Sequence, residues 1–228
     1  MKRKFLSFLS VLLILAGLVL VSLPRMSSYV IDKRTKEIVT VVEDIPAETL
    51  QENLETESEF DFDSILEVSP TETFSATNTV DESLIIGRLI IPTIDLNLTV
   101  FNGVTNPILH AGVGAMRPHL KMGTGNFPIA GHYSSRENTL FGALDVLEVD
   151  DLIYLTDNER MYEYQVYDAR VVEPTDVHWI EDDIAEQHGK PIISLMNCYF
   201  EDGVFTKKRY FVFAELIDSH AANEMNDL

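Results

Sequence analysis

From Leu84 onward the chain is built from short apolar runs, rich in β-branched and aromatic residues and separated by turn residues. Their length and residue types are those of β-strands. The runs lie at 84–92, 96–100, 127–132, 152–155, 162–166, 191–198 and 209–213. Helical pattern is short and rare, and 140–147 is its best candidate. Seven or eight short strands within about 135 residues predict a mainly β fold, a closed or nearly closed barrel with short helices.

The N-terminus has the pattern of a membrane anchor. Basic residues 2–4 precede the 19 uncharged residues Phe5–Leu23. As a helix this run is roughly 28 Å long, close to the thickness of the hydrocarbon layer. A cleaved signal peptide has an apolar core of about 7–15 residues and a small-residue cleavage site, whereas no Ala-x-Ala follows this longer run. We expect one membrane-spanning helix within residues 1–26, with its N-terminus in the cytoplasm and the rest of the chain outside the plasma membrane.

The net charge of −20 is concentrated in one segment. Between Glu37 and Glu82 there are 14 acidic residues and no Lys or Arg. Such a charge argues against binding nucleic acid, whose phosphates require a basic surface. Apart from a possible short helix near 29–42, the segment has too little apolar periodicity to fold alone. The expected domains are an anchor (1–26), an acidic extracytoplasmic linker (27–82), the β domain (83–218) and a C-terminal tail (219–228).

Cys198 is the only cysteine, so neither an internal disulfide nor a zinc site built on several cysteines is possible. A lone Cys is often a small buried hydrophobe. Here it ends one predicted strand, His132 ends another, and Arg209 begins the last. If the last two strands form a hairpin, Cys198 and Arg209 face each other across the mouth of a ten-residue loop.

These three residue types suffice for acyl transfer. A thiolate is the nucleophile, and a neighbouring positive charge lowers the pKa of a thiol. An imidazole can pass a proton to a leaving amine, and a guanidinium can stabilise an oxyanion. The sequence has no His-Glu-x-x-His, Gly-x-Ser-x-Gly or phosphate-binding glycine motif. The remaining histidines are expected on the surface or in loops: His110, His119, His178, His188 and His220.

With these motifs in this order, the stretch from about Leu84 to Ile217 resembles the sortase family, and its details resemble class A. The resemblance rests on Gly131-His132, on the apolar strand ending in Cys198 and on Arg209-Tyr-Phe-Val. Further similar segments lie at 125–132, 140–144, 153–157 and 172–176.

The resemblance implies a closed eight-stranded barrel and a cysteine transpeptidase at a Gram-positive cell surface. Cys198 would cleave a Leu-Pro-x-Thr-Gly-like signal of surface proteins between Thr and Gly, forming a thioacyl enzyme. The acceptor would be the amine of a peptidoglycan precursor of the lipid II type. His132 would act as acid and then base, and Arg209 would stabilise the oxyanion. The resemblance also places Ala130, Met196 and Asn197 in the signal groove, covered by the loop 176–190.

Two departures from the family pattern affect these expectations. Asn197 stands where a β-branched hydroxyl residue is usual, which bears on signal preference. The loop 117–124 has no carboxylate, although some class A members bind Ca²⁺ through carboxylates there. Because Ca²⁺ requires oxygen ligands, we expect activity without Ca²⁺ or any other cofactor.

Three alternatives remain open. A pilin-polymerising sortase would use the same residues with a Lys amine as acceptor, often beneath an N-terminal lid segment, and no lid is recognisable in the acidic linker. A catalytically inactive sortase-like module would bind surface proteins without cleaving them. A hydrolase would transfer the acyl group to water, a choice that depends on groove shape and water exclusion.

Overall fold

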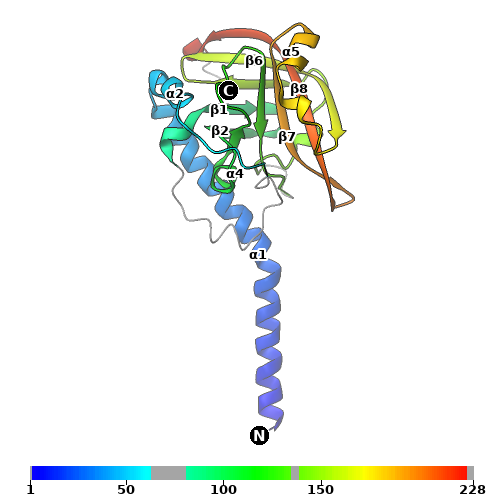
Figure 1. Ribbon diagram of the computed structural model, residues 1–228. Coiled ribbons are helices and arrows are strands. Elements are labelled where there is room, and N and C mark those ends of the chain that lie inside the picture. Colours follow the sequence, from blue (N-terminus) through cyan, green and yellow to red (C-terminus); the bar gives the residue numbers. More distant parts are fainter. Residues whose placement is uncertain (1, 63–80, 135–138, 225–228) are drawn as a thin grey trace.

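The computed structural model describes residues 2–62, 81–134 and 139–224. Eight strands in these residues form a closed barrel in the order β1-β2-β3-β4-β7-β8-β6-β5, which confirms the predicted fold (Figure 1). The strands are β1 (Ile85–Ile91), β2 (Leu96–Asn102), β3 (Val113–Ala115), β4 (Asn126–Ala130), β5 (Leu152–Thr156), β6 (Arg160–Val172), β7 (Ile192–Glu201) and β8 (Val204–Ala221). Neighbours pair antiparallel except for the parallel pairs β2–β3 and β4–β7.

The described helices are short, apart from the first. The α-helices are α1 (Lys2–Asp44), α2 (Ala47–Asn53), α4 (Asn106–Ala111) and α5 (Asp183–His188). Single 3-10 turns are η2 (Glu82–Leu84), η3 (Pro92–Ile94), η4 (Leu144–Val146), η5 (Val177–Ile180) and η6 (Ala222–Glu224). The predicted helix at 140–147 is therefore reduced to η4.

Alternation along the strands separates the buried residues into two layers. Ile193 and Leu195 of β7 belong to a cluster with members from strands all round the barrel, and this cluster fills its interior. Met196 and Cys198 point to the opposite face, as the period of two requires. They belong to a second cluster, between the barrel and its covering helices, which includes Phe211 of β8. The site described below lies in this outer layer.

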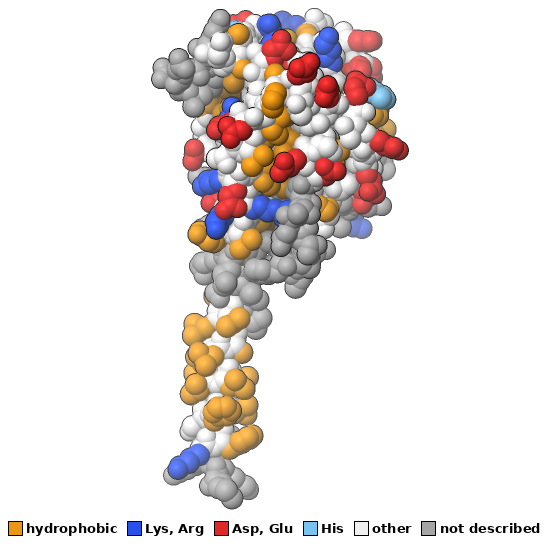
Figure 2. Space-filling model, turned by 90° about the vertical axis from the view of Figure 1, so that its left-hand side faces the viewer, with side chains coloured by type: hydrophobic (Ala, Val, Ile, Leu, Met, Phe, Trp, Pro, Cys, Tyr) orange, Lys and Arg blue, Asp and Glu red, His pale blue; other side chains and the backbone are white. Residues whose placement is uncertain are grey.

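A membrane-spanning helix is expected at residues 1–26, and α1 occupies that position as the long helix leading away from the barrel (Figure 1). Its N-terminal half carries many exposed apolar side chains (Figure 2), among them Phe5, Phe8, Leu12, Leu13, Ile14, Leu15 and Leu18. Among the residues that the structure describes, no helix has both the length and the hydropathy needed to cross a membrane.

Residues 29–53, expected as part of a solvated linker, instead fold against the barrel. The possible helix near 29–42 lies within α1 and buries Val42 completely, as α2 does Leu50. The Asn158 amide donates hydrogen bonds to the carbonyls of Val42 and Ile45 at the end of α1. The segment is therefore not a solvated linker, because the apolar residues of α1 and α2, too few to fold alone, are buried on the barrel. Linker residues 63–80 and tail residues 225–228 lie outside the described residues.

Candidate active site

Cys198 and Arg209 lie directly opposite each other on the antiparallel strands β7 and β8. The expected ten-residue loop between them is instead a continuation of the hairpin, which turns at Asp202-Gly203. Both turn residues have positive φ angles, 50° and 77°. An Asp-Gly pair favours this two-residue turn, so the sequence held a signal for it. The predicted juxtaposition of Cys198 and Arg209 is present.

His132 follows β4, which pairs in parallel with β7, the strand that carries Cys198. Ala130 of β4 is the register partner of Met196 of β7, and the Gly131 N–H donates to the Met196 carbonyl (3.0 Å). His132 follows Ala130 by two residues, as Cys198 follows Met196, so the paired strands lead toward both residues at the same end. Strands β7 and β8 thus pair Cys198 with Arg209, and the chain reaches His132 directly after β4, the neighbour of β7 on its other side.

Two residues that the sequence analysis did not select surround the His132 ring. The Asn106 Oδ1 lies 3.3 Å from His132 Nε2, at the start of α4. The His110 ring meets the His132 ring edge-on, with 4.9 Å between centroids. His110 Nδ1 lies 2.9 Å from the Asn106 carbonyl oxygen. The expectation that His110 is a surface or loop residue is wrong, because it is a buried residue of α4 beside His132.

The nucleophile and the imidazole are covered. Cys198 and His132 are each 1% exposed, whereas Arg209 is only partly buried. The Arg209 Nη1 donates to the carbonyls of Lys207 (2.8 Å) and Lys208 (3.3 Å). The guanidinium is therefore bound to carbonyls of its own strand, and Arg209 also lines a pocket.

A pocket of about 190 Å³ adjoins Arg209. Its lining is mostly apolar: Phe62, Met116, Val172, Glu173, Pro174, Asp176, Val177, Ile180, Met196, Arg209 and Phe211. Of the expected groove residues, Met196 lines this pocket. Ala130 is fully buried in the outer cluster beside Met196 and Cys198. Asn197 is 3% exposed, and its amide donates to the Phe141 carbonyl (2.7 Å).

The acidic segment reaches this pocket, although the sequence showed no lid in it. Phe60 forms a bridge with Val104, and the Val104 N–H donates to the Glu59 carbonyl (2.8 Å). This pairing leads the chain to Phe62, which lines the pocket together with Met196 and Arg209. A hydrophobic side chain of the acidic segment therefore forms part of the pocket wall near Met196 and Arg209.

The expected covering loop, 176–190, contains η5 and α5 and is tied to β4 by Arg117. The Arg117 guanidinium donates to Asp182 Oδ1 (2.8 Å) and Glu181 Oε2 (3.3 Å). It also donates to the Asn126 carbonyl, and the Asn126 N–H donates to Asp182 Oδ1 (2.9 Å). The hydrogen bond from Arg117 holds the pKa of the Asp182 carboxyl below its ordinary value. This arrangement fixes one wall of the pocket, through Val177 and Ile180.

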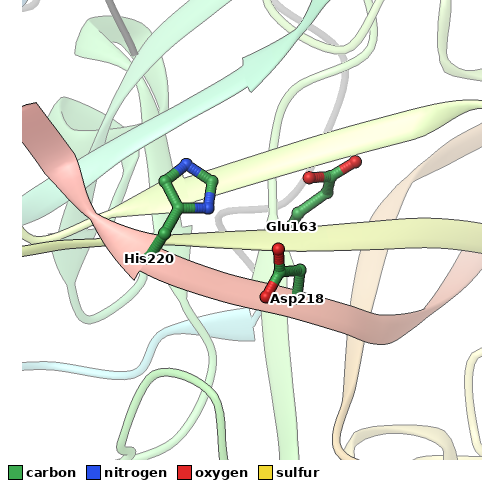
Figure 3. A group of neighbouring side chains, drawn as sticks. All are labelled: Glu163, Asp218 and His220. Atoms are coloured by element: carbon green, nitrogen blue, oxygen red, sulfur yellow. The ribbon is translucent and has the colours of Figure 1, made fainter. Parts of the chain in front are cut away.

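One group of described side chains has the composition of a cation site. Glu163, Asp218 and His220 project from neighbouring strands β6 and β8, with ligand atoms within 4.8 Å of one another (Figure 3). Asp218 lies nine residues beyond Arg209 on β8, roughly 30 Å along an extended strand. The group is therefore separate from Cys198 and Arg209.

Together these features have the residue types expected of a thiol acyl-transfer site, on the outer face of a closed β-barrel. A family model described as "Sortase domain" matches residues 89–217. Sortase A of Bacillus anthracis is 32% identical over 220 residues, 96% of this chain and 98% of that protein. Sortase A of Listeria monocytogenes is 30% identical over 208 residues, 91% of this chain and 90% of that protein.

Solved structures agree with this assignment. The Listeria monocytogenes sortase A structure is 34% identical, with a TM-score of 0.54, and the match covers 60% of this chain and 90% of that one. Sortase C-3 of Streptococcus pneumoniae, at 22% identity and a TM-score of 0.60, shares the fold over 83% of this chain and 93% of its own. The chain belongs to the sortase family, whose members are cysteine transpeptidases.

Proposed function

We propose that this sortase cleaves a Leu-Pro-x-Thr-Gly-like signal between Thr and Gly and joins the Thr carbonyl to an amine of a peptidoglycan precursor. The observation that carries the proposal is the pairing of Cys198 with Arg209 across β7 and β8. The parallel pairing of β4 with β7, which leads the chain to the buried His132, supports it. The mainly apolar pocket beside Arg209, with Met196 in its wall, suits the Leu and Pro side chains of such a signal.

The reaction needs only these three side chains. The Cys198 thiolate attacks the Thr carbonyl carbon, and the Arg209 guanidinium stabilises the oxyanion that forms. The C–N bond breaks as His132 donates a proton to the leaving Gly amine, which leaves a thioester on Cys198. The acceptor amine then attacks the thioester, His132 takes its proton, and the Cys198 thiolate is restored.

A pilin-polymerising sortase is the second candidate, and Phe62 is the observation that favours it. Such an enzyme would use the same three residues with a pilin Lys amine as acceptor, and a segment of its own chain would cover the site. Phe62 lines the pocket at the point where a signal would bind. The two candidates differ in the acceptor amine, which the experiment below varies.

Attachment to the plasma membrane through residues 1–26, with the barrel on the outer side, forms part of the proposal. The basic residues 2–4 and the uncharged run Phe5–Leu23 support it. The test separates cells into membrane and soluble fractions and treats intact cells with protease. Recovery of the protein in the soluble fraction, or complete protection from protease, would refute this attachment.

Activity without Ca²⁺ is also proposed, because the loop 117–124 offers no carboxylate, and its Arg117 already pairs with Glu181 and Asp182 of the covering loop. We expect equal rates in Ca²⁺ and in a chelator. A several-fold rise in rate on adding Ca²⁺ would overturn this expectation.

The proposed function is tested by incubating the full-length protein with a Leu-Pro-x-Thr-Gly peptide and an amine, followed by mass spectrometry. The expected product joins the Thr to a Gly-based amine and disappears in Cys198→Ala. A product formed only with a Lys-containing pilin peptide would select the second candidate. Cleavage without joining, across all amines, would identify a hydrolase.

A further inference from the structure

Asn197 directly precedes the nucleophile, yet its side chain faces away from it. Met196 and Cys198 belong to the outer cluster, which contains the pocket residues Met116 and Phe211. Asn197 lies between them on the strand, so its side chain points to the opposite face, that of Ile193 and Leu195. It is 3% exposed there and does not line the pocket.

The partner of Asn197 is a residue that also holds His132. The Asn197 Nδ2 donates to the Phe141 carbonyl (2.7 Å), and the Phe141 N–H donates to the His132 carbonyl (3.1 Å). The Phe141 ring packs on Gly131, where an added Cβ would lie 2.6 Å from ring atom Cδ2. Phe141 therefore joins the strand that carries Cys198 to the chain that carries His132.

The amide suits this connection. Its nitrogen lies one bond further from the backbone than a threonine hydroxyl does, which lets it reach the Phe141 carbonyl. The Asn197 Oδ1 is buried without a hydrogen-bond partner among the described residues, and a buried unpaired acceptor is destabilising. The destabilisation from the unpaired Oδ1 thus accompanies a short hydrogen bond from the Nδ2 of the same amide to the Phe141 carbonyl.

We propose that Asn197 is a positioning residue, which sets the relative placement of His132 and Cys198 through Phe141 and does not read the sorting signal. This inference rests on the proposed function, in which His132 transfers protons for the reaction at Cys198. The sequence analysis expects Asn197 to affect signal preference. The proposal instead assigns Asn197 an effect on the rate of the chemical step.

The test compares Asn197→Leu and Asn197→Thr with the wild type in the full-length protein. Leu keeps the approximate side-chain volume and removes the hydrogen bond to Phe141. Thr replaces the amide with a hydroxyl, which is polar but closer to the backbone. Ser194→Ala is the matched control, because it removes another buried side-chain hydrogen bond of β7, from Ser194 Oγ to Asn126 Oδ1 (2.7 Å). Thermal unfolding of each variant establishes that it folds.

We expect Asn197→Leu to lower kcat by about 10- to 100-fold, as misplacement of reacting groups by about 1 Å does, with little change in KM or in the preferred signal. Alkylation of Cys198 by iodoacetamide should slow as well, whereas Ser194→Ala should change neither quantity. Should Asn197→Leu not fold, Asn197→Thr is expected to show the same pattern to a smaller degree.

Two results would overturn the inference. One is a change in KM or signal preference with kcat preserved, because Asn197 would then contact the signal. The other is a wild-type kcat together with wild-type alkylation. Alkylation requires no sorting signal, so it decides the role of Asn197 even if no peptide is joined and the proposed function itself fails.

Discussion

At the residue scale, the sequence pattern indicates the three proposed reacting groups but not the residues that surround His132. His132, Cys198 and Arg209 lie at the ends of strands expected from the sequence, although β7 and β8 continue beyond Cys198 and Arg209. Asn106 and His110 could not be selected in this way, because α4 meets His132 only in the folded chain. The same holds for Phe141, which contacts His132 through a backbone hydrogen bond that leaves no sequence pattern.

Arg209→Lys tests the role of the guanidinium. Lys keeps the positive charge but loses the planar group of donors, and loss of one oxyanion donor lowers kcat by about 10²- to 10³-fold. We expect a decrease of that size in the rate of peptide joining. Lys208→Ala is the control, since it removes a neighbouring charge, and it should remain within about twofold of the wild type. Equal rates for Arg209→Lys and the wild type would exclude the guanidinium from the reaction.

At the element scale, the strands with strong alternation were predicted and the short ones were not. β1, β2 and β4 to β8 each contain a recognised apolar run, whereas β3 has three residues, Val113–Ala115, too few to show a period. Strands β7 and β8 are longer than the sequence analysis expects, because the hairpin continues through residues 199–201 and 204–208 to the turn at Asp202-Gly203. Phe200 pairs with Phe205 in this extension, and the Asp-Gly turn sets its end.

Phe62→Ala tests whether the acidic segment restricts the pocket. A signal that enters beside Met196 and Arg209 must displace the Phe62 ring or pack on it. If it displaces the ring, removal of the ring should lower KM several-fold without changing kcat. A rise in KM would instead mean that Phe62 forms part of the binding surface. Phe5→Ala, on an exposed part of α1, is the control.

Asp182→Asn tests the attachment of the covering loop to Arg117. The folded-state pKa of Asp182 lies below its ordinary value of 3.8. Its contribution to stability is therefore complete above about pH 4 and is lost as the pH falls through the folded-state pKa. Because the carboxylate is 54% exposed, we expect a loss of about 1 kcal/mol at neutral pH.

Denaturant titrations at neutral pH and at about pH 3 measure this difference. The difference in the free energy of unfolding between wild type and Asp182→Asn should be smaller at the lower pH. The KM for the signal should be higher in the variant. A difference in the free energy of unfolding that is independent of pH would contradict the assigned role of the carboxylate. Asp183→Asn, the neighbouring acid that makes no described ion pair with Arg117, serves as control.

At the scale of the whole molecule, the boundary between linker and domain differs from the expected one. Acidic composition predicted a solvated segment up to residue 82, but α1 and α2 bury apolar residues on the barrel. Asn102 of β2 reinforces this packing, since its amide donates to the carbonyls of Asn53 and Leu54 (both 3.1 Å). Composition averages over a segment, so it could not show that one face of a charged helix is buried.

Two adjacent residues of α1 test whether the helix is part of the folded domain. Val42 is 0% exposed and Val41 is 38% exposed. Val→Ala changes helix propensity equally at both positions, so the difference between the variants isolates packing. We expect Val42→Ala to lower the free energy of unfolding by about 2 kcal/mol more than Val41→Ala does. Denaturant titration measures this, and equal values would mean that α1 does not pack on the barrel in solution.

The most direct test of the account is the intact mass of the full-length protein after brief mixing with a Leu-Pro-x-Thr-Gly peptide in the absence of an amine. The account predicts a protein heavier by the acyl fragment ending at Thr, mapped by digestion to Cys198 and removed by hydroxylamine. Cys198→Ala should show no adduct. Peptide cleavage without any adduct on Cys198, or cleavage that persists in Cys198→Ala, would contradict the central claim that this thiol carries the acyl group.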